Sequence, residues 1–148
     1  MKKSLIILLG LGFLLLNACS SVQTHTKGGE LKKTLDGEIQ DSDFIQTIGI
    51  GAADQQLDNK TQKQATSRTA AITMAQYEMV GIIKGLQIEG GITVSQAMEK
   101  DSSISALVND SVKGAEVIKT EWTADDGCVV TLRLSKKRLA QMTKMKFK

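Results

Sequence analysis

Few side chains in this sequence are of types that do chemistry. The chain has two cysteines, Cys19 and Cys128, and one histidine, His25. His25 has no metal-ligating partners nearby in the sequence, which favours a solvated histidine over a metal site. Asp125 and Asp126 are adjacent, but two carboxylates in one tight turn, without further oxygen ligands at regular spacing, are more typical of turn formers than of a calcium site. Neither a metal nor a cofactor is expected.

Cys19 has the most specific sequence context. Two lysines near the N-terminus precede an apolar and glycine run from Leu5 to Leu16, which ends at Leu16-Asn17-Ala18-Cys19. The run is shorter than the roughly 20 residues that a membrane-spanning helix needs, so it predicts the hydrophobic region of a secretory signal peptide. We expect this signal peptide to cover residues 1–18 and to be removed.

The end of that run resembles the lipobox of bacterial lipoproteins. The resemblance implies that the Cys19 thiol is joined to a diacylglycerol, that the chain is cut just before it, and that the new amine is acylated. Asn17 departs from the pattern, and the alternative is a plain secretory signal with a chance cysteine. Each buried methylene contributes ~0.8 kcal/mol, so two acyl chains make anchoring stable. Ser20, in place of an aspartate that signals inner-membrane retention in this family, implies the outer membrane.

Lipidation of Cys19 leaves Cys128 unpaired in an oxidising compartment. Alternation in the segment from Cys128 to Leu134 places Cys128, Val130, Leu132 and Leu134 on one face of a strand. The sequence therefore predicts a buried Cys128 rather than a reactive thiol.

Charge and composition argue against nucleic acid as a partner. The net charge of +3 includes Lys2 and Lys3, so the mature chain is left with about +1. Aromatic residues make up only 3% of the chain, which gives few rings for stacking on bases or sugars. Without its signal peptide the chain has the length of one domain and a tether.

The segment 19–43 is polar and glycine-containing, and it predicts a flexible tether. The folded domain is expected over 44–148, beginning with a strand in which Phe44, Gln46, Ile48 and Ile50 share one face. The glycines at 49 and 51 lack the third glycine and the immediate helix of a dinucleotide fingerprint. Close packing of a helix over this strand is the simpler explanation.

The longest helix is expected from about Asn59 to Lys84, with Asp58 as its N-cap and Gly85 as its stop. Its predicted apolar stripe consists of Ala65, Thr69, Ile72, Ala75, Met79, Ile82, Ile83 and Leu86.

Shorter elements follow. Residues 86–95 predict a strand that Gly90-Gly91 interrupts as a hairpin turn or a bulge, and 96–100 is ambiguous. A short helix over 103–113 begins at Asp101 or Ser102, and an Asp-Gly hairpin joins strands over 116–122 and 128–134. The expected class is α+β: a small antiparallel sheet of three to four strands packed against one long and one short helix.

The C-terminal segment 135–148 is strongly basic and allows a short amphipathic helix. Its cations could contact anionic lipid headgroups, peptidoglycan carboxylates or an acidic partner, and the alternative is a solvated basic tail. The six residues are Lys136, Lys137, Arg138, Lys144, Lys146 and Lys148.

Taken in order, these features resemble a known family. A lipobox and tether lead to Gly-Ile-Gly-Ala-Ala after a strand, an alanine-rich helix, a glycine-interrupted middle, and a closing section with Gly114, Trp122 and Asp126-Gly127. Over about residues 44–140 this resembles the small outer-membrane lipoproteins grouped with the flagellar protein FlgP and the antigenic lipoprotein Lpp-twenty. The resemblance implies helices over an antiparallel sheet and, for the FlgP branch, a ring or disc around the flagellar motor. It implies no catalytic residues and does not select a branch.

Three classes of function follow from these patterns. The first is a structural lipoprotein at the periplasmic face of the outer membrane whose domains self-associate, with flagellar motor proteins as partners in the FlgP branch. The second is a monomeric envelope lipoprotein that binds peptidoglycan or another envelope protein through its basic C-terminus. An enzyme is the least favoured, because no histidine lies in the expected folded part and no spacing selects reacting residues.

Overall fold

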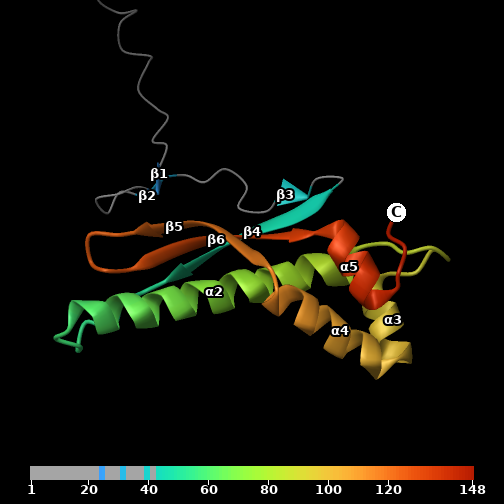
Figure 1. The fold of residues 1–148 in the computed structure, drawn as a ribbon, viewed down its shortest axis with the longest axis horizontal. Coiled ribbons are helices and arrows are strands. Elements are labelled where there is room, and N and C mark those ends of the chain that lie inside the picture. Colours follow the sequence, from blue (N-terminus) through green and yellow to red (C-terminus); the bar gives the residue numbers. More distant parts are fainter. Residues whose placement is uncertain (1–23, 26–30, 33–38, 41–42) are drawn as a thin grey trace, which may run out of the picture.

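The computed structural model describes residues 24–25, 31–32, 39–40 and 43–148. This part has an α+β fold with two layers, in which an antiparallel sheet lies over one long helix (Figure 1). The predicted fold class is confirmed. The predicted signal peptide and the lipidation site Cys19 lie outside the described residues, as does most of the predicted tether.

The main sheet has the strand order β3-β4-β6-β5. β4 (Phe44–Gly51) and β6 (Cys128–Ser135) pair antiparallel along their whole length. β5 (Glu116–Trp122) pairs with the other edge of β6. β3 (Ile39–Gln40) pairs with β4, so the sheet begins inside the segment predicted as a tether. β1 (Thr24–His25) and β2 (Leu31–Lys32) form a separate two-stranded pair.

One face of the sheet forms the core. Ile45 and Thr47 of β4 are fully buried, whereas the residues that alternate with them are half-buried or exposed. On β6 the row that alternation predicts is buried: Cys128, Val130, Leu132 and Leu134. Val129 and Thr131, on the other face of this strand, are buried as well. The register places Gly49 opposite Val130 and Gly51 opposite Cys128 on this same face.

The long helix α2 (Lys60–Gly85) packs on the core face, but not through the whole stripe that hydrophobicity predicts. Ala65 and Thr69 of that stripe are exposed. The buried row runs at steps of four residues through Ser67, Ala71, Ala75, Met79 and Ile83. Its first members are small because β4 approaches the helix backbone closely, so they carry little hydrophobic signal.

The N-cap of α2 is Asn59, one residue after the predicted Asp58. The Asn59 side chain accepts hydrogen bonds from the backbone N–H groups of Thr61 and Gln62. An asparagine oxygen at this position satisfies donors that the first helical turn leaves unpaired.

The segment after α2 turns back on itself. Gly90 and Gly91 have φ angles of 99° and 76°, and Gln87 bridges to Thr93, so the glycines form a hairpin turn. The strand predicted over 86–95 is wrong: Gln87, Ile88 and Thr93 form only isolated bridges, because the glycine turn leaves the arms too short for a strand. Thr93 instead caps α3 (Val94–Lys100) through a capping box with Gln96. The structure thus adds a short helix where the sequence was ambiguous.

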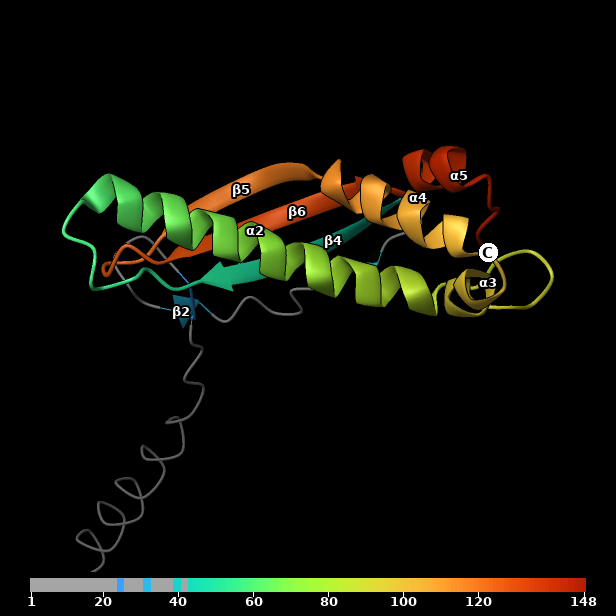
Figure 2. The same ribbon diagram turned by 90° about the horizontal axis from the view of Figure 1, so that it is seen from below.

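Two more short helices complete the fold. α4 (Ser102–Lys113) has Asp101 as its N-cap and Gly114 as its C-cap. α5 (Lys136–Thr143) begins at the N-cap Ser135 and forms the amphipathic helix that the sequence allows. Figure 2 shows that α3, α4 and α5 gather around the C-terminal half of α2, while its N-terminal half lies under the sheet alone. Among the described helices, none is long and apolar enough to cross a bilayer.

Candidate interaction surfaces

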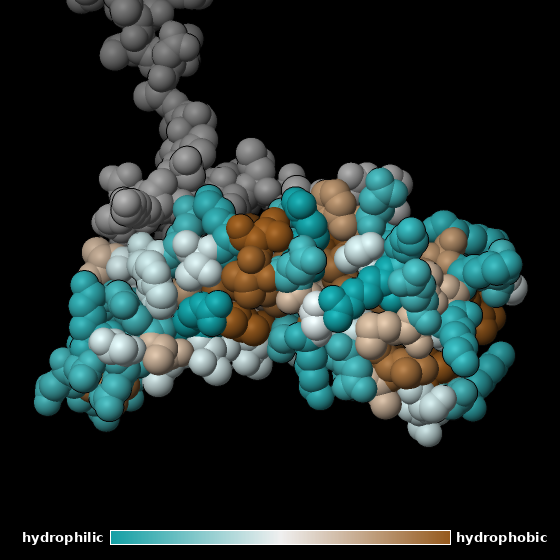
Figure 3. All heavy atoms as spheres, viewed as in Figure 1, coloured by the Kyte–Doolittle hydropathy of each residue, from teal (hydrophilic) through white to brown (hydrophobic). Residues whose placement is uncertain are grey.

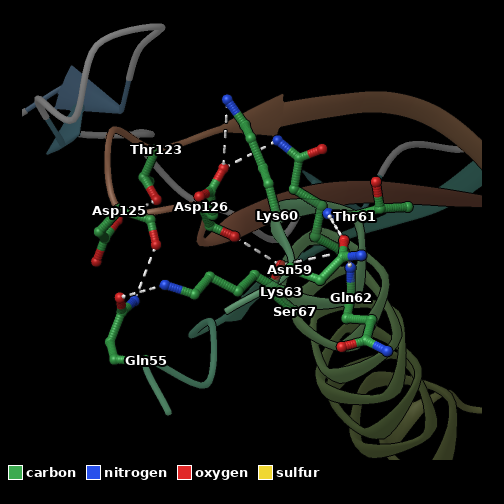
Figure 4. A network of polar contacts seen from close by, with 11 residues as sticks. Gln55, Asn59, Lys60, Thr61, Gln62, Lys63, Ser67, Thr123, Asp125 and Asp126 are labelled. Atoms are coloured by element: carbon green, nitrogen blue, oxygen red, sulfur yellow. Dashed lines mark hydrogen bonds and ion pairs between the residues drawn. The ribbon is translucent and has the colours of Figure 1, made fainter. Parts of the chain in front are cut away.

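The β5–β6 hairpin docks on the start of α2 through polar contacts (Figure 4). Asp126 has a φ of 63°. Its carboxylate accepts a hydrogen bond from the Gln64 amide at 3.0 Å and forms an ion pair with the Lys60 ammonium at 3.8 Å. The Ser67 hydroxyl donates to the Asp126 carbonyl oxygen at 2.8 Å. The carboxylate therefore already has partners from the chain itself.

The neighbouring Asp125 also bonds within the turn. Its carboxylate accepts a hydrogen bond from the Thr123 hydroxyl at 2.5 Å, and its carbonyl accepts one from the Gln55 amide at 3.0 Å. The Thr123 hydroxyl is the main cause that holds the pKa of Asp125 below its usual range. These contacts agree with the turn-forming interpretation. In the part of the chain that the structure describes, no group of three or more His, Cys, Asp or Glu residues could hold a metal ion.

Cys128 occupies the core position that alternation predicts. It is fully buried opposite Gly51, and burial raises the pKa of its thiol, an effect that the charge of Arg68 partly offsets. A protonated, inaccessible thiol is a poor nucleophile.

The structure brings four of the six predicted basic residues together. Lys136 and Lys137 on α5, with Lys146 and Lys148 near the C-terminus, line a groove of 710 Å³. We call this the basic groove. Its other lining residues are Asp43, Ser135, Ala140, Met145 and Phe147.

The remaining two basic residues lie apart from the groove. An Arg138 guanidinium N–H donates to the carbonyl oxygen of Gly114 at 2.9 Å, so this side chain satisfies the C-terminal end of α4. Lys144 is the exposed C-cap residue of α5, with a φ of 57°.

The last residues are held by backbone hydrogen bonds and do not form a free tail. The Glu89 N–H donates to the Lys146 carbonyl at 2.9 Å, and the Lys148 N–H donates to the Gln87 carbonyl at 3.1 Å. The Lys146 ammonium also lies 3.4 Å from a Glu89 carboxylate oxygen. Lys146 therefore already has an acidic partner from the chain itself.

Sequence reasoning missed a second kind of surface, which is apolar. Figure 3 shows apolar surface over β5 among hydrophilic neighbours. Five large apolar side chains of the described part are exposed, by 40% to 73%. They are Val117 and Ile118, which we call the β5 patch, and Ile50, Met74 and Tyr77.

The last three residues line a shallow, open groove of 840 Å³ between β4 and α2, which we call the α2 groove. Its remaining lining residues are small: Ala65, Thr66, Thr69, Ala70 and Thr73. Every lining residue is uncharged. Met74 and Tyr77 lie outside the predicted stripe of α2, and that mismatch was the available sequence signal for an exposed apolar face.

The α2 groove and the β5 patch lie at opposite sides of the sheet. β5 is the last strand of the order on one side, and Figure 2 shows β4 on the other side of β6. The described residues of β3 pair only with Ile45 and Gln46, so no described strand covers the rest of that edge of β4.

Comparison with known proteins adds no assignment: no family model, no curated protein and no solved structure matches this chain. The resemblance to the FlgP and Lpp-twenty group stays a prediction.

Proposed function

We propose that this protein is a non-enzymatic lipoprotein of the outer membrane, anchored through Cys19, whose domains associate with one another in a structural role. The role resembles that of the FlgP component of the flagellar motor disc. The observation that carries the proposal is that all five exposed large apolar residues of the described part fall on two patches at opposite sides of one sheet.

Two different patches on opposite sides favour a head-to-tail contact between copies. Such a contact joins the β5 patch of one copy to the α2 groove of the next and leaves a free patch at each end. Repetition gives a ring if the rotation closes and a filament if it does not. A two-fold dimer would instead use one self-complementary patch.

The chemistry of the two patches is compatible with such a contact. The α2 groove is uncharged and its small residues leave room for the branched side chains of Val117 and Ile118. Two of the three charges on β5 satisfy each other, because the Lys119 ammonium lies 3.0 Å from a Glu121 carboxylate oxygen. The third, Glu116, is exposed beside Val117 and would lie at the rim of the contact. Burial of apolar surface stabilises association by about 25 cal/mol per Å².

The proposed contact inserts side chains and does not extend the sheet. β5 has a bulge between Val117 and Lys119, and bulges with charged neighbours hinder pairing at a sheet edge. Ile118 lies at this bulge and is 41% exposed.

Light scattering on the detergent-extracted protein tests the proposal. We expect a large homo-oligomer for the wild type, and much smaller species for Ile118→Lys and for Met74→Lys. Asn109→Lys, at an exposed position on α4, is the matched control and should assemble as the wild type does.

Mixing the two disrupted variants tests the head-to-tail arrangement itself. Ile118→Lys keeps an intact α2 groove and Met74→Lys keeps an intact β5 patch, so an equimolar mixture should form dimers that neither variant forms alone. A strictly monomeric wild type over a wide concentration range would contradict the proposal and favour the monomeric alternative, in which the basic C-terminus binds peptidoglycan or another envelope protein.

A further inference from the structure

We infer that the basic groove binds the anionic headgroups of membrane lipids. The groove combines two walls of lysine with apolar side chains between them. Lys136 and Lys137 come from the first turn of α5, and Lys146 and Lys148 come from the terminal segment. The inference does not depend on self-association.

The backbone fixes both walls relative to each other. The Lys136 N–H donates to the Asp43 carbonyl at 3.0 Å, which holds the start of α5 against the start of β4. Phe147 bridges to Ile88, so the terminal segment is held against the chain before the Gly90-Gly91 turn. A groove whose walls are already in place loses little conformational freedom when it binds a ligand.

The groove keeps a net positive charge. Asp43 is the one acidic residue among its lining residues, and Glu89 pairs with Lys146 from outside. In the part of the chain that the structure describes, Lys136, Lys137 and Lys148 form no ion pair. Their charges are available to an anionic ligand.

The apolar residues of the groove favour a lipid over a soluble anion or a polar polymer. Met145 and Phe147 are half-buried against the core and line the groove together with the four lysines, so they contribute apolar surface to it. A lipid interface offers the matching arrangement, in which phosphates lie directly above acyl chains. Each lysine near an anionic surface is expected to strengthen binding about fivefold at low salt.

The position of the groove also fits a membrane surface. Asp43 begins the continuous described part of the chain and lines the groove. The chain enters the main sheet just before Asp43, at β3, which pairs with Ile45 and Gln46. A lipid anchor at Cys19 would therefore keep the groove within reach of the bilayer.

The test uses the mature chain with Cys19→Ser, so that no acyl group contributes to binding. Its sedimentation is measured with vesicles of phosphatidylcholine alone and with vesicles that also contain phosphatidylglycerol, at low and high salt. We expect binding at least about tenfold stronger to the anionic vesicles, and loss of this difference at high salt.

Two sets of variants with the same change in net charge separate the groove from net charge. Lys→Gln at 136, 137, 146 and 148 should remove the preference for anionic vesicles. Lys→Gln at 63, 84, 100 and 113 should leave it unchanged. Equal losses in both sets would overturn the inference, because net charge would then explain binding. Thermal unfolding checks that each variant folds. The single variants Lys137→Gln and Lys148→Gln repeat the test with smaller changes, and each should weaken binding to anionic vesicles about fivefold.

A third variant tests the apolar surface. Met145→Ser should weaken binding to the anionic vesicles, and unchanged binding by a folded variant would contradict a role for the apolar surface. Binding to purified sacculi without binding to anionic vesicles would overturn the inference in favour of a peptidoglycan site. Oligomeric state is measured in parallel, so a failure of lipid binding is distinguishable from a failure of the proposed assembly.

Discussion

Gly49 of β4 lies directly against the backbone of α2 at Ala71: a Cβ atom added to Gly49 would overlap with the Ala71 carbonyl oxygen. Gly51 has the same relationship to the Ser67 carbonyl. This close approach brings the Thr47 hydroxyl within 2.8 Å of the Ala75 carbonyl oxygen, to which it donates a hydrogen bond. At Gly49 and Gly51 the sheet therefore meets the backbone of the long helix directly, whereas Met79 and Ile83 further along the helix pack through their side chains.

Gly49→Ala should strongly destabilise the protein, because the added methyl group must push the helix away from the sheet. Overpacking in a core costs typically 1–3 kcal/mol, and we expect a loss of at least about 3 kcal/mol in urea denaturation. Gly81→Ala is the matched control, since no atom lies within 4 Å of a Cβ there. It should raise the free energy of unfolding by about 0.5–1 kcal/mol. Similar stabilities for the two variants would show that α2 does not pack on β4 in this way.

Asn59→Ala should cost about 1 kcal/mol, because two N–H groups of the first turn of α2 lose their acceptor. Asp58→Ala, at the neighbouring exposed position, should change stability by less than about 0.5 kcal/mol. Thermal unfolding of both variants checks the assignment. The reverse order would restore Asp58 as the cap.

Stability should fall in acid partly through Asp125. The Thr123 hydroxyl, followed by backbone hydrogen bonds from Asp125 and Gly127, holds the pKa of Asp125 below its usual value, so the ionised form stabilises the folded state. A carboxylate with a lowered folded pKa contributes its stability above the unfolded pKa of about 3.9 and loses it as pH falls through the folded pKa.

Comparison of the wild type with Thr123→Val isolates this contribution. The wild type should be more stable at neutral pH, and the difference between the two unfolding temperatures should narrow as pH falls below about 3.9. A difference that stays constant over this range would mean that the Asp125 ionisation is not linked to folding through Thr123.

Cys128 should resist thiol reagents in the folded protein and react fully after denaturation. It is completely buried, and burial raises the pKa of its thiol, so little thiolate is available at neutral pH. Titration with a chromogenic disulfide reagent measures both states. The denatured wild-type lipoprotein should contain one free thiol, whereas two free thiols would show that Cys19 is unmodified. Rapid reaction of Cys128 in the native protein would contradict its placement in the core.

The predictable parts of the fold are those with strong local signals. The Asp-Gly hairpin, the alternation of Cys128 to Leu134 and the glycine pair at the end of β4 each identify a feature correctly. The face of α2 was harder to predict, because Ser67 and Ala71 pack through small size and not through hydrophobicity.

The candidate surfaces were predictable only in part. The basic cluster was visible in the sequence, but which of its residues line the groove was not. Arg138 hydrogen-bonds to Gly114, which is distant in sequence, whereas Lys146 and Lys148 lie beside Lys136 through tertiary contacts. Ile118 and Tyr77 lie on patches at opposite sides of the sheet because of the strand order, which local sequence patterns do not determine.

Disulfide crosslinking in intact membranes tests the proposed assembly most directly. The double variant Tyr77→Cys with Ile118→Cys places one thiol in the α2 groove and one in the β5 patch, and a lipidated Cys19 and a buried Cys128 would not compete with them. Mild oxidation should give a ladder of covalent multimers for the double variant and only monomers for each single variant. No covalent product from the double variant, or the same products from a single variant, would contradict a head-to-tail assembly.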